Sequence, residues 1–257
     1  MPLTCRCTLA MHAMNRILVV TLLAGWGAAA VAADPALPFD QTFLADYSKL
    51  QRRTEGPVSD YGYTVPNIRS RFGEFPKGFF VDTPEVLISP DSPYKGGKPE
   101  DLAIVSNMMR DALIARMQAG GYPIATAPGP EVFVIRLALT DLKIQKNKRN
   151  LLAYTPGGAV IKAGADAFKD MMQRTGIIDM TMQAEVIDGG TSEVLVGLVI
   201  PDPTPGKRIE FEQVRALVDE YGARARCHVD NARLPENQQV NCLLPAAREA
   251  RPPAANR

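Results

Sequence analysis

The strictest pattern in the chain is an alternation through IDMTMQAEV, residues 178–186. Five apolar residues, Ile178, Met180, Met182, Ala184 and Val186, alternate with four polar ones, Asp179, Thr181, Gln183 and Glu185. Successive side chains of a β-strand point to opposite faces, so this pattern predicts a strand with one face on a core and the other in water. The glycine turn of IDGGTSE then leads into the apolar run EVLVGLVI, which predicts an antiparallel hairpin.

Further strands and helices are predicted on both sides of this hairpin. Strands are expected over residues 78–89, 122–126 and 131–145, and the last is placed centrally in the sheet because both of its faces are apolar. Helices are expected from Pro99 to the glycine pair at 120–121, over 155–176 and over 210–226. This order predicts an α+β fold, with a mostly antiparallel sheet of about five strands and helices packed on one face. The polar sheet face would meet solvent, an N-terminal arm or a partner.

The first residues have the pattern of an export signal. Arg16 precedes ILVVTLLAGWGAAAVAA, an uncharged run that ends in small residues, and cleavage after Ala32 or Ala33 fits. Met14 is a plausible alternative start. An uncleaved membrane anchor is the competing interpretation, because the run approaches the about 18 apolar residues that a span needs. No cysteine stands at the end of the run, where a lipoprotein would carry its acyl chains.

The chain therefore divides into four expected parts. Residues 1–33 form the signal peptide, 34–76 an extended arm rich in Pro, Gly and aromatic residues, 77–226 a single α+β domain, and 227–257 a flexible tail. The 29 basic and 28 acidic residues give a formal charge of +1, which provides no long-range field for nucleic acid. The expected location is the periplasm, with association with the outer membrane or secretion as alternatives.

Two cysteines remain after the predicted signal. A disulfide between Cys227 and Cys242 would close a loop of about fifteen residues and contribute on the order of 3 kcal/mol in the chain-entropy model. Two free thiols in a mobile tail are the alternative, because spacing alone does not bring two Cα atoms together. His228 lies beside Cys227, but these three residues are fewer ligands than ordinary metal sites use, so no metal or other cofactor is expected.

Carboxylates are the remaining candidates for chemistry. Asp46, Asp60, Asp82 and Asp91 lie near aromatic or glycine-rich loops, and two carboxylates can act as acid and base in hydrolysis. Aspartate is also common in turns, where it bonds to nearby backbone amides, and this is the interpretation we favour. The basic cluster in LKIQKNKRN, residues 142–150, has no interleaved aromatic residues for base stacking and is interpreted as a solvated loop.

The segment 155–176 has small residues at every fourth position: Ala159, Ala163 and Ala167. This spacing lets a helix approach another backbone closely. Packing on its own sheet is the ordinary outcome, and a surface for self-association or for a partner is the functional one.

Several motifs together resemble one protein family. Over residues 43–221 the chain looks like the bacterial envelope family labelled domain of unknown function 3313. The motifs that carry this resemblance are FLADYSKL (43–50), VDTPEVLISPDSPYKG, PGPEVFVIRLALTDLK and AEVIDGGTSEVLVG. Members are typically predicted outer-membrane lipoproteins of Gram-negative bacteria, so the resemblance implies an envelope location. It implies no established activity. This chain departs from the family in having no lipobox cysteine and in its extension over 227–257.

FLADYSKL is interpreted as a structural strap for the N-terminal arm. Its apolar residues, Phe43, Leu44, Tyr47 and Leu50, would be buried on the domain, each fully buried one contributing roughly 1.5–3 kcal/mol, while Asp46 caps local amides. The leading functional hypothesis is a non-enzymatic envelope module for binding or assembly. Its expected partners are an envelope protein or a second copy of the chain, with peripheral membrane contact. The alternative is a periplasmic hydrolase of cell-wall or lipid substrates that uses a carboxylate pair near Asp46, Asp82 and Asp91.

Overall fold

One sheet organises the part of the chain that the structure describes. The computed structural model describes residues 37–55, 58–72, 78–95, 99–146, 175–201, 206–209 and 211–245. Its strands are β1 (Gln51–Glu55), β2 (Val58–Thr64), β3 (Phe79–Val81), β4 (Glu85–Ile88), β5 (Phe133–Lys146), β6 (Thr175–Asp188) and β7 (Val194–Pro201). Its helices are α1 (Ile68–Phe72), α2 (Pro99–Ala119), α4 (Phe211–Ala232) and the short 3-10 helix η2 (Glu236–Gln238).

The strand order is β1-β2-β7-β6-β5-β3, and β4 also pairs with β5. Neighbours from β1 to β5 along this order are antiparallel, whereas β3 and β4 run parallel to β5. The predicted α+β class and mostly antiparallel sheet are confirmed, with seven described strands in place of about five. β5 is central, as its two apolar faces predicted.

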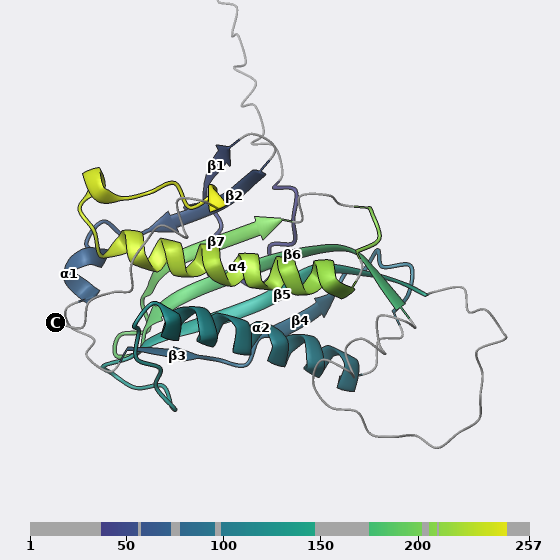
Figure 1. Ribbon diagram of the computed structural model, residues 1–257, viewed down its shortest axis with the longest axis horizontal. Coiled ribbons are helices and arrows are strands. Elements are labelled where there is room, and N and C mark those ends of the chain that lie inside the picture. The colour runs from purple at the N-terminus through teal and green to yellow at the C-terminus, as the bar shows by residue number, and fades with distance from the viewer. Residues whose placement is uncertain are drawn as a thin grey trace, which may run out of the picture. The chain divides into compact units, whose positions relative to one another are not determined.

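Helices α2 and α4 lie side by side across one face of the sheet (Figure 1). Both helices are buried against alternate residues of β5 and β6. The core formed in this way includes Met109, Leu113 and Met117 of α2, Val214, Val218 and Tyr221 of α4, and Ile135, Leu137, Leu139, Met180 and Met182 of the two strands. No helix within the described residues is long and apolar enough to cross a membrane.

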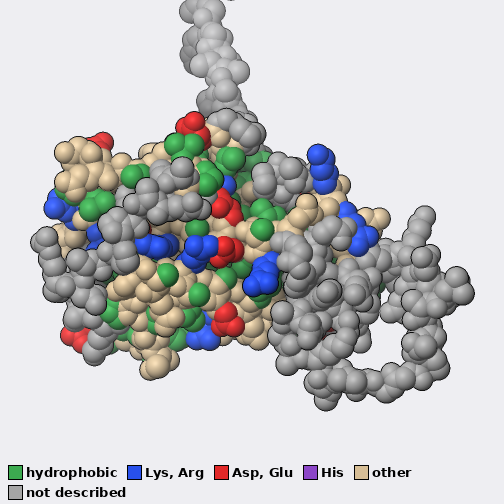
Figure 2. Space-filling view, in the orientation of Figure 1, with side chains coloured by type: hydrophobic (Ala, Val, Ile, Leu, Met, Phe, Trp, Pro, Cys, Tyr) green, Lys and Arg blue, Asp and Glu red, His purple; other side chains and the backbone are tan. Residues whose placement is uncertain are grey.

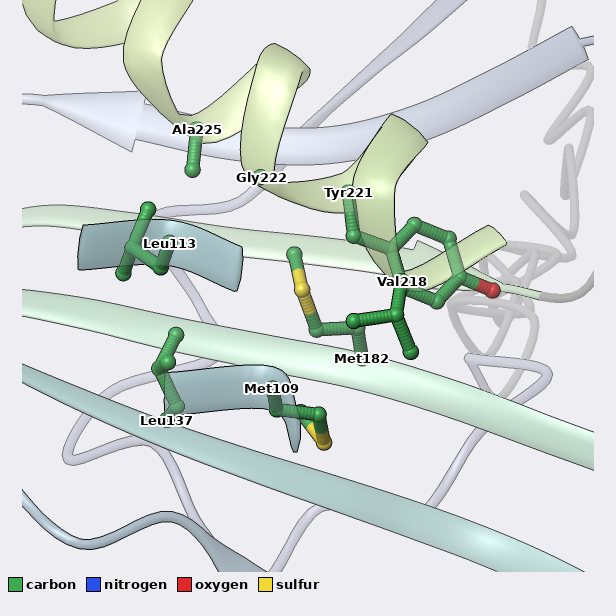
Figure 3. Close-up of a pocket in the computed structure, with 8 residues that line it drawn as sticks. All are labelled: Met109, Leu113, Leu137, Met182, Val218, Tyr221, Gly222 and Ala225. Atoms are coloured by element: carbon green, nitrogen blue, oxygen red, sulfur yellow. The ribbon is translucent and has the colours of Figure 1, made fainter. Parts of the chain in front are cut away.

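A small apolar gap remains where the two helices meet the sheet (Figure 3). Its volume is about 10 Å³, and its lining includes Met109, Leu113, Met182 and Gly222. A cavity of about 10–15 Å³ is the least that holds one water molecule, and a water also needs polar partners. The gap is therefore an imperfection of core packing and is too small for a ligand.

Gly222→Ala is expected to stabilise the protein by about 0.5–1 kcal/mol, because glycine inside a helix costs this much relative to alanine. A Cβ atom at position 222 would lie 3.4 Å from Cγ of Arg116 and 3.7 Å from the backbone oxygen of Ala112, which are ordinary contacts. Thermal unfolding measures the change. Gly78→Ala is the opposing control and should destabilise, since Gly78 has φ +81° and its Cβ would lie 2.1 Å from the oxygen of Pro123. A lower melting temperature for Gly222→Ala would show that α2 and α4 leave no room for the added methyl group.

The turn between β6 and β7 explains the IDGGTSE motif. The Asp188 carboxylate accepts hydrogen bonds from the amides of Gly190 (2.8 Å) and Thr191 (3.1 Å) and forms an ion pair with Arg71 of α1. Burial raises the pKa of Asp188, but these donors outweigh burial and hold the pKa below its ordinary value. A Cβ at Gly189 would lie 2.1 Å from the backbone oxygen of Gly129, so the close approach of the two loops requires glycine.

Four expected segments differ from the structure. The expected arm, 34–76, contains β1 and β2, which add a hairpin to the sheet edge beside β7. The expected strand over 122–126 is reduced to one bridge at Ile124, and the one over 78–89 is divided into β3 and β4 around Pro84. The expected tail begins inside α4, which continues to Ala232, because the apolar residues Val229 and Ala232 extend its buried face.

The helix-bearing face carries basic and acidic side chains among small apolar ones (Figure 2). Arg116 of α2, for example, forms an ion pair with Asp219 of α4. Leu244 is the large apolar residue that is exposed in the described part of the chain. Where Figure 2 shows this face in colour, apolar side chains are therefore interspersed with charged ones.

Candidate functional site

The sheet face opposite α2 and α4 is covered by residues 37–50, which we call the covering segment. Phe39, Phe43 and Leu44 of this segment pack with Ala138 of β5 and Val199 of β7. Leu137 and Leu139 face the helices, so Ala138 between them must face the other way. We call this side of the sheet the covered face.

Gln183 of β6 is the central polar group of the covered face and is 0% exposed. Its side-chain amide donates to the backbone oxygen of Asp40 (2.7 Å) and to the hydroxyl of Thr140 (2.8 Å), and its carbonyl oxygen accepts from the Tyr47 hydroxyl (2.6 Å). A buried amide without these partners would be costly. Gln183 therefore depends on the covering segment for two of these three hydrogen bonds.

Glu185 lies two residues further along β6 and is 1% exposed. One carboxylate oxygen accepts from the Ala45 amide of the covering segment, and the other accepts from Arg136 of β5 at 3.1 Å. The Arg136 guanidinium also stacks over the Phe43 ring, 4.8 Å from its centroid. The alternation in the sequence predicted that this face of β6 lies in water, and this is wrong for Thr181, Gln183 and Glu185, which are buried. Of the three possibilities named for the polar face, which were solvent, an N-terminal arm or a partner, the N-terminal segment is the one that contacts Gln183 and Glu185.

FLADYSKL contributes both apolar and polar contacts. Phe43 and Leu44 are buried, whereas Tyr47 and Leu50 are partly buried against the same cluster. The Tyr47 hydroxyl accepts from the amides of Phe43 (3.0 Å) and Leu44 (2.9 Å) while it donates to Gln183. Burial raises the pKa of Tyr47 above its ordinary value. Asp46 bonds to the Ser48 side chain and amide, which lowers its pKa.

Tyr47→Ala is expected to lower the free energy of unfolding by about 2 kcal/mol, because the ring contacts are lost and Gln183 is left with an unsatisfied buried oxygen. Urea unfolding measures this change. Lys49→Ala, at an exposed position of the same segment, is the matched control and should change stability little. If Tyr47→Ala unfolds at the same urea concentration as the wild type, the strap interpretation is wrong.

A second buried polar cluster connects the β1–β2 hairpin to α4. Asp60 is 0% exposed, and its carboxylate contacts Nε of Arg53 (2.6 Å) and Nε2 of His228 (3.4 Å). Nη1 of Arg53 lies 3.3 Å from Nδ1 of His228. Because arginine can only donate, Nδ1 accepts, and this assigns the proton of the neutral ring to Nε2, facing Asp60.

This geometry disfavours a charged His228. A second ring proton would lie on Nδ1 and point at the Arg53 guanidinium, and Arg224 adds a further positive charge. Burial is the main cause that holds the pKa of His228 below its ordinary value of 6.5, although the hydrogen bond to Asp60 opposes it. Burial raises the pKa of Asp60, but His228 and Arg53 outweigh it, so that pKa also lies below its ordinary value.

Stability is therefore expected to fall as the pH drops below 6.5. Below that pH the unfolded chain binds a proton at His228 that the folded chain does not, so acid favours unfolding. His228→Gln should flatten this dependence in the window just below pH 6.5, whereas Asp60 contributes only below its ordinary value of 3.8. Urea unfolding of both proteins between neutral pH and the onset of carboxylate titration measures the two slopes. Equal slopes would contradict the depressed pKa of His228.

The carboxylates singled out in the sequence have separate, local roles. The carboxylate of Asp46 bonds to Ser48 and Lys49, and that of Asp82 accepts from the Thr83 amide. Asp91 follows β4 in a turn, where its backbone amide donates to the Ser89 hydroxyl. Asp60 is the exception, because it lies within β2 and not in a turn. Within the described residues, no three His, Cys, Asp or Glu side chains are grouped so that they could hold a metal ion.

The remaining sequence candidates divide into two groups. Cys227 and Cys242 form the predicted disulfide, with Cα atoms 5.7 Å apart. The second group lies outside the described residues. It consists of the proposed cleavage site (Ala32 and Ala33), the proposed interaction helix (Ala159, Ala163 and Ala167) and residues 147–150 of the basic loop.

Two parts of the site were missed in the sequence. Arg53 and Asp60 are directly opposite each other in the β1–β2 pair, so recognising a hairpin around Gly56-Pro57 would have paired them. The partnership of Gln183 and Glu185 with the covering segment had no local signal, since the partners lie more than a hundred residues away.

The comparisons with known proteins identify a family. The model described as "Protein of unknown function (DUF3313)" matches residues 40–223. The chain belongs to this family. The matched region begins at Asp40 in the covering segment and ends within α4, so it includes Asp60, Gln183 and Glu185 of this chain. A search of curated proteins finds no match.

Solved structures give only remote similarities. The PelC dodecamer from Paraburkholderia phytofirmans is 12% identical, with a TM-score of 0.29, and the match covers 63% of this chain and 93% of that one. A PDZ domain protein from Parabacteroides distasonis is 10% identical, with a TM-score of 0.32 over 62% of this chain and 33% of that one. Similarities at these TM-scores carry no inference about assembly or activity.

Proposed function

We propose that this protein is exported to the cell envelope and acts there as a non-enzymatic module for binding or assembly. The apolar run that follows Arg16 supports export, and so does the disulfide, because disulfides persist in oxidising compartments. Sequencing the N-terminus of the protein recovered from a periplasmic fraction tests this part. A new terminus at Ala33 or Asp34 is expected, and recovery in the cytoplasm with the leader intact would contradict it.

The proposed binding role rests on the contacts by which the covered face holds residues 37–50. Sheet side chains bond to main-chain groups: Asp141 accepts from the Asp40 amide (3.1 Å), Gln183 donates to the Asp40 oxygen and Glu185 accepts from the Ala45 amide. In peptide recognition, hydrogen bonds to the main chain supply affinity, and pockets for side chains supply specificity. Phe39, Phe43 and Leu44 are such anchors here.

The covered face therefore works as a receptor for a polypeptide segment. In this structure the chain's own residues 37–50 occupy that face. In an assembly, we propose that residues 37–50 of a second copy occupy the face. The segment of the second copy has the same sequence, so it can make the same contacts with the face. Exchange of an identical element between copies is a low-cost route to oligomers. The contacts inside the folded chain would be replaced by equal contacts between chains.

A labelled synthetic peptide with the sequence of residues 37–50 tests this role on the full-length protein. Weak binding to the wild type is expected, because its own segment competes, and stronger binding to Tyr47→Ala, whose segment is held less firmly. A peptide carrying the Tyr47→Ala change is the matched control and should not bind to either protein. Failure of the unmodified peptide to bind to the Tyr47→Ala protein would contradict the receptor role.

The hydrolase alternative is not proposed. It required a carboxylate pair near Asp46, Asp82 and Asp91, but these residues lie in three different loops, where the carboxylates of Asp46 and Asp82 accept local hydrogen bonds. No observation on the described residues favours that chemistry over binding.

A further inference from the structure

An open groove lies beside the first turns of α4, away from the covered face. Its volume is about 640 Å³, within the range of about 300–1,000 Å³ typical of small-molecule sites. Its lining residues are Lys207, Arg208, Ile209, Gln213, Ala216, Leu217 and Glu220. We propose that this groove binds an anionic amphiphile, meaning a phosphate or carboxylate group attached to an apolar chain.

The basic side of the groove is fixed to the sheet. The amide of Gly206 donates to the Ile178 oxygen (2.8 Å), and the amide of Ile209 donates to the Ile177 oxygen (2.7 Å). Lys207 and Arg208 lie between these two attachments and are exposed. The two cationic residues are therefore presented by a backbone that is bonded to β6 on both sides.

Arg208 is positioned further by a glycine. A Cβ atom at Gly176 of β6 would lie 3.2 Å from Nε and 3.3 Å from Cγ of Arg208, so the arginine side chain lies directly over this glycine. The absence of a side chain at position 176 leaves the room that the guanidinium occupies. An arginine held in this way loses less side-chain freedom when it binds an anion.

The opposite wall belongs to α4 and is mixed, with the apolar residues Ala216 and Leu217 standing between the polar residues Gln213 and Glu220 in the sequence. Ala216 is exposed, Leu217 is half-buried against the core, and Ile209 closes the base of the groove at 5% exposure. Glu220 is the lining carboxylate, and it bonds to Nε of Arg224 at 3.0 Å. A ligand with an anionic head at Lys207 and Arg208 and an apolar chain along Ala216 and Leu217 matches both walls.

Calorimetric titration of the full-length protein tests the proposal with three probes: lysophosphatidylglycerol below its micelle concentration, glycerol phosphate and inorganic phosphate. We expect binding of the lysolipid, and at most weak binding of the two phosphates that lack a chain. The double variant Lys207→Gln/Arg208→Gln should bind the lysolipid at least about tenfold more weakly. Arg215→Gln, an exposed charge on α4 outside the groove lining, is the matched control and should bind as the wild type does.

Three outcomes would overturn the proposal. Equal affinity for inorganic phosphate and the lysolipid would mean a simple anion site without a role for Ala216 and Leu217. Binding that the double variant retains would place the ligand elsewhere. Binding only to phosphatidylglycerol vesicles, and not to the monomeric lysolipid, would indicate adsorption to a membrane surface instead of occupancy of the groove. Thermal unfolding of each variant establishes that the fold is intact, and the receptor role of the covered face is tested separately by the peptide.

Discussion

Asp60→Ala is expected to lower the free energy of unfolding by about 3 kcal/mol. Breaking a buried ion pair by removing one partner typically costs about 3–5 kcal/mol, because the other charge stays buried without compensation. The lower end applies here, since the Arg53 side chain is 38% exposed and can turn partly toward water. His228 would also lose the acceptor for its Nε2 proton. Urea unfolding at neutral pH measures the loss.

Two controls separate this effect from a general intolerance of substitution. Asp82→Ala removes an exposed carboxylate whose bond is to the neighbouring Thr83 amide, and it should cost little. Asp60→Asn keeps the shape and an acceptor oxygen while it removes the charge, so it should lie between the wild type and Asp60→Ala. If all three variants unfold like the wild type, Asp60 does not hold the hairpin to α4.

The sequence predicted the sheet well where alternate residues differ in polarity. IDMTMQAEV became the core of β6, because Met180, Met182 and Ala184 face the helices. The same alternation could not say what covers the polar side. Gln183 and Glu185 look like solvent-facing residues, yet they are buried because a segment 136–143 positions earlier in the chain supplies their partners. Periodicity separates the two faces of a strand and says nothing of distant segments that pack on them.

The predictions that were wrong concentrate at the two ends of the domain. The hairpin β1–β2 lies in residues 34–76, which were interpreted as an arm because they are rich in Pro, Gly and aromatic residues, and its place in the sheet follows from pairing of β2 with β7. Asp60 was grouped with turn aspartates because it lies near aromatic and glycine residues. Its partners are a cross-strand neighbour, Arg53, and a helical residue, His228, in a region that the sequence suggested was flexible.

The two buried polar clusters have different consequences for function. Arg53, Asp60 and His228 connect a hairpin to a helix that is fixed nearby by the disulfide, so they act on stability. Gln183 and Glu185 connect the sheet to a segment that reaches back to Leu37 and is bonded through its main chain. The proposed exchange of this segment between copies depends on the second arrangement.

Removing the disulfide by the double substitution Cys227→Ala/Cys242→Ala is expected to cost about 3 kcal/mol, as the chain-entropy model gives for a loop of this length, and to lower the melting temperature by roughly 6–12 °C. The sequence separation is 15, and both cysteines are 3% exposed. The bond ties the end of α4 to the segment after η2, where the Asn231 side chain also bonds to the amide and oxygen of Val240. Thermal unfolding measures the loss, and mass spectrometry before and after reduction of the unfolded chain detects the bond.

The same bond makes the fold dependent on its compartment. Domains of this size are stable by only about 5–15 kcal/mol, so a loss of about 3 kcal/mol in a reducing environment is a large share. The wild type should therefore melt at a lower temperature when it is made and kept reduced, whereas the Cys227→Ala/Cys242→Ala protein should melt at the same temperature with and without reductant. If reductant does not change the melting temperature of the wild type, the disulfide no longer supports export. The N-terminal signal would then be the remaining support.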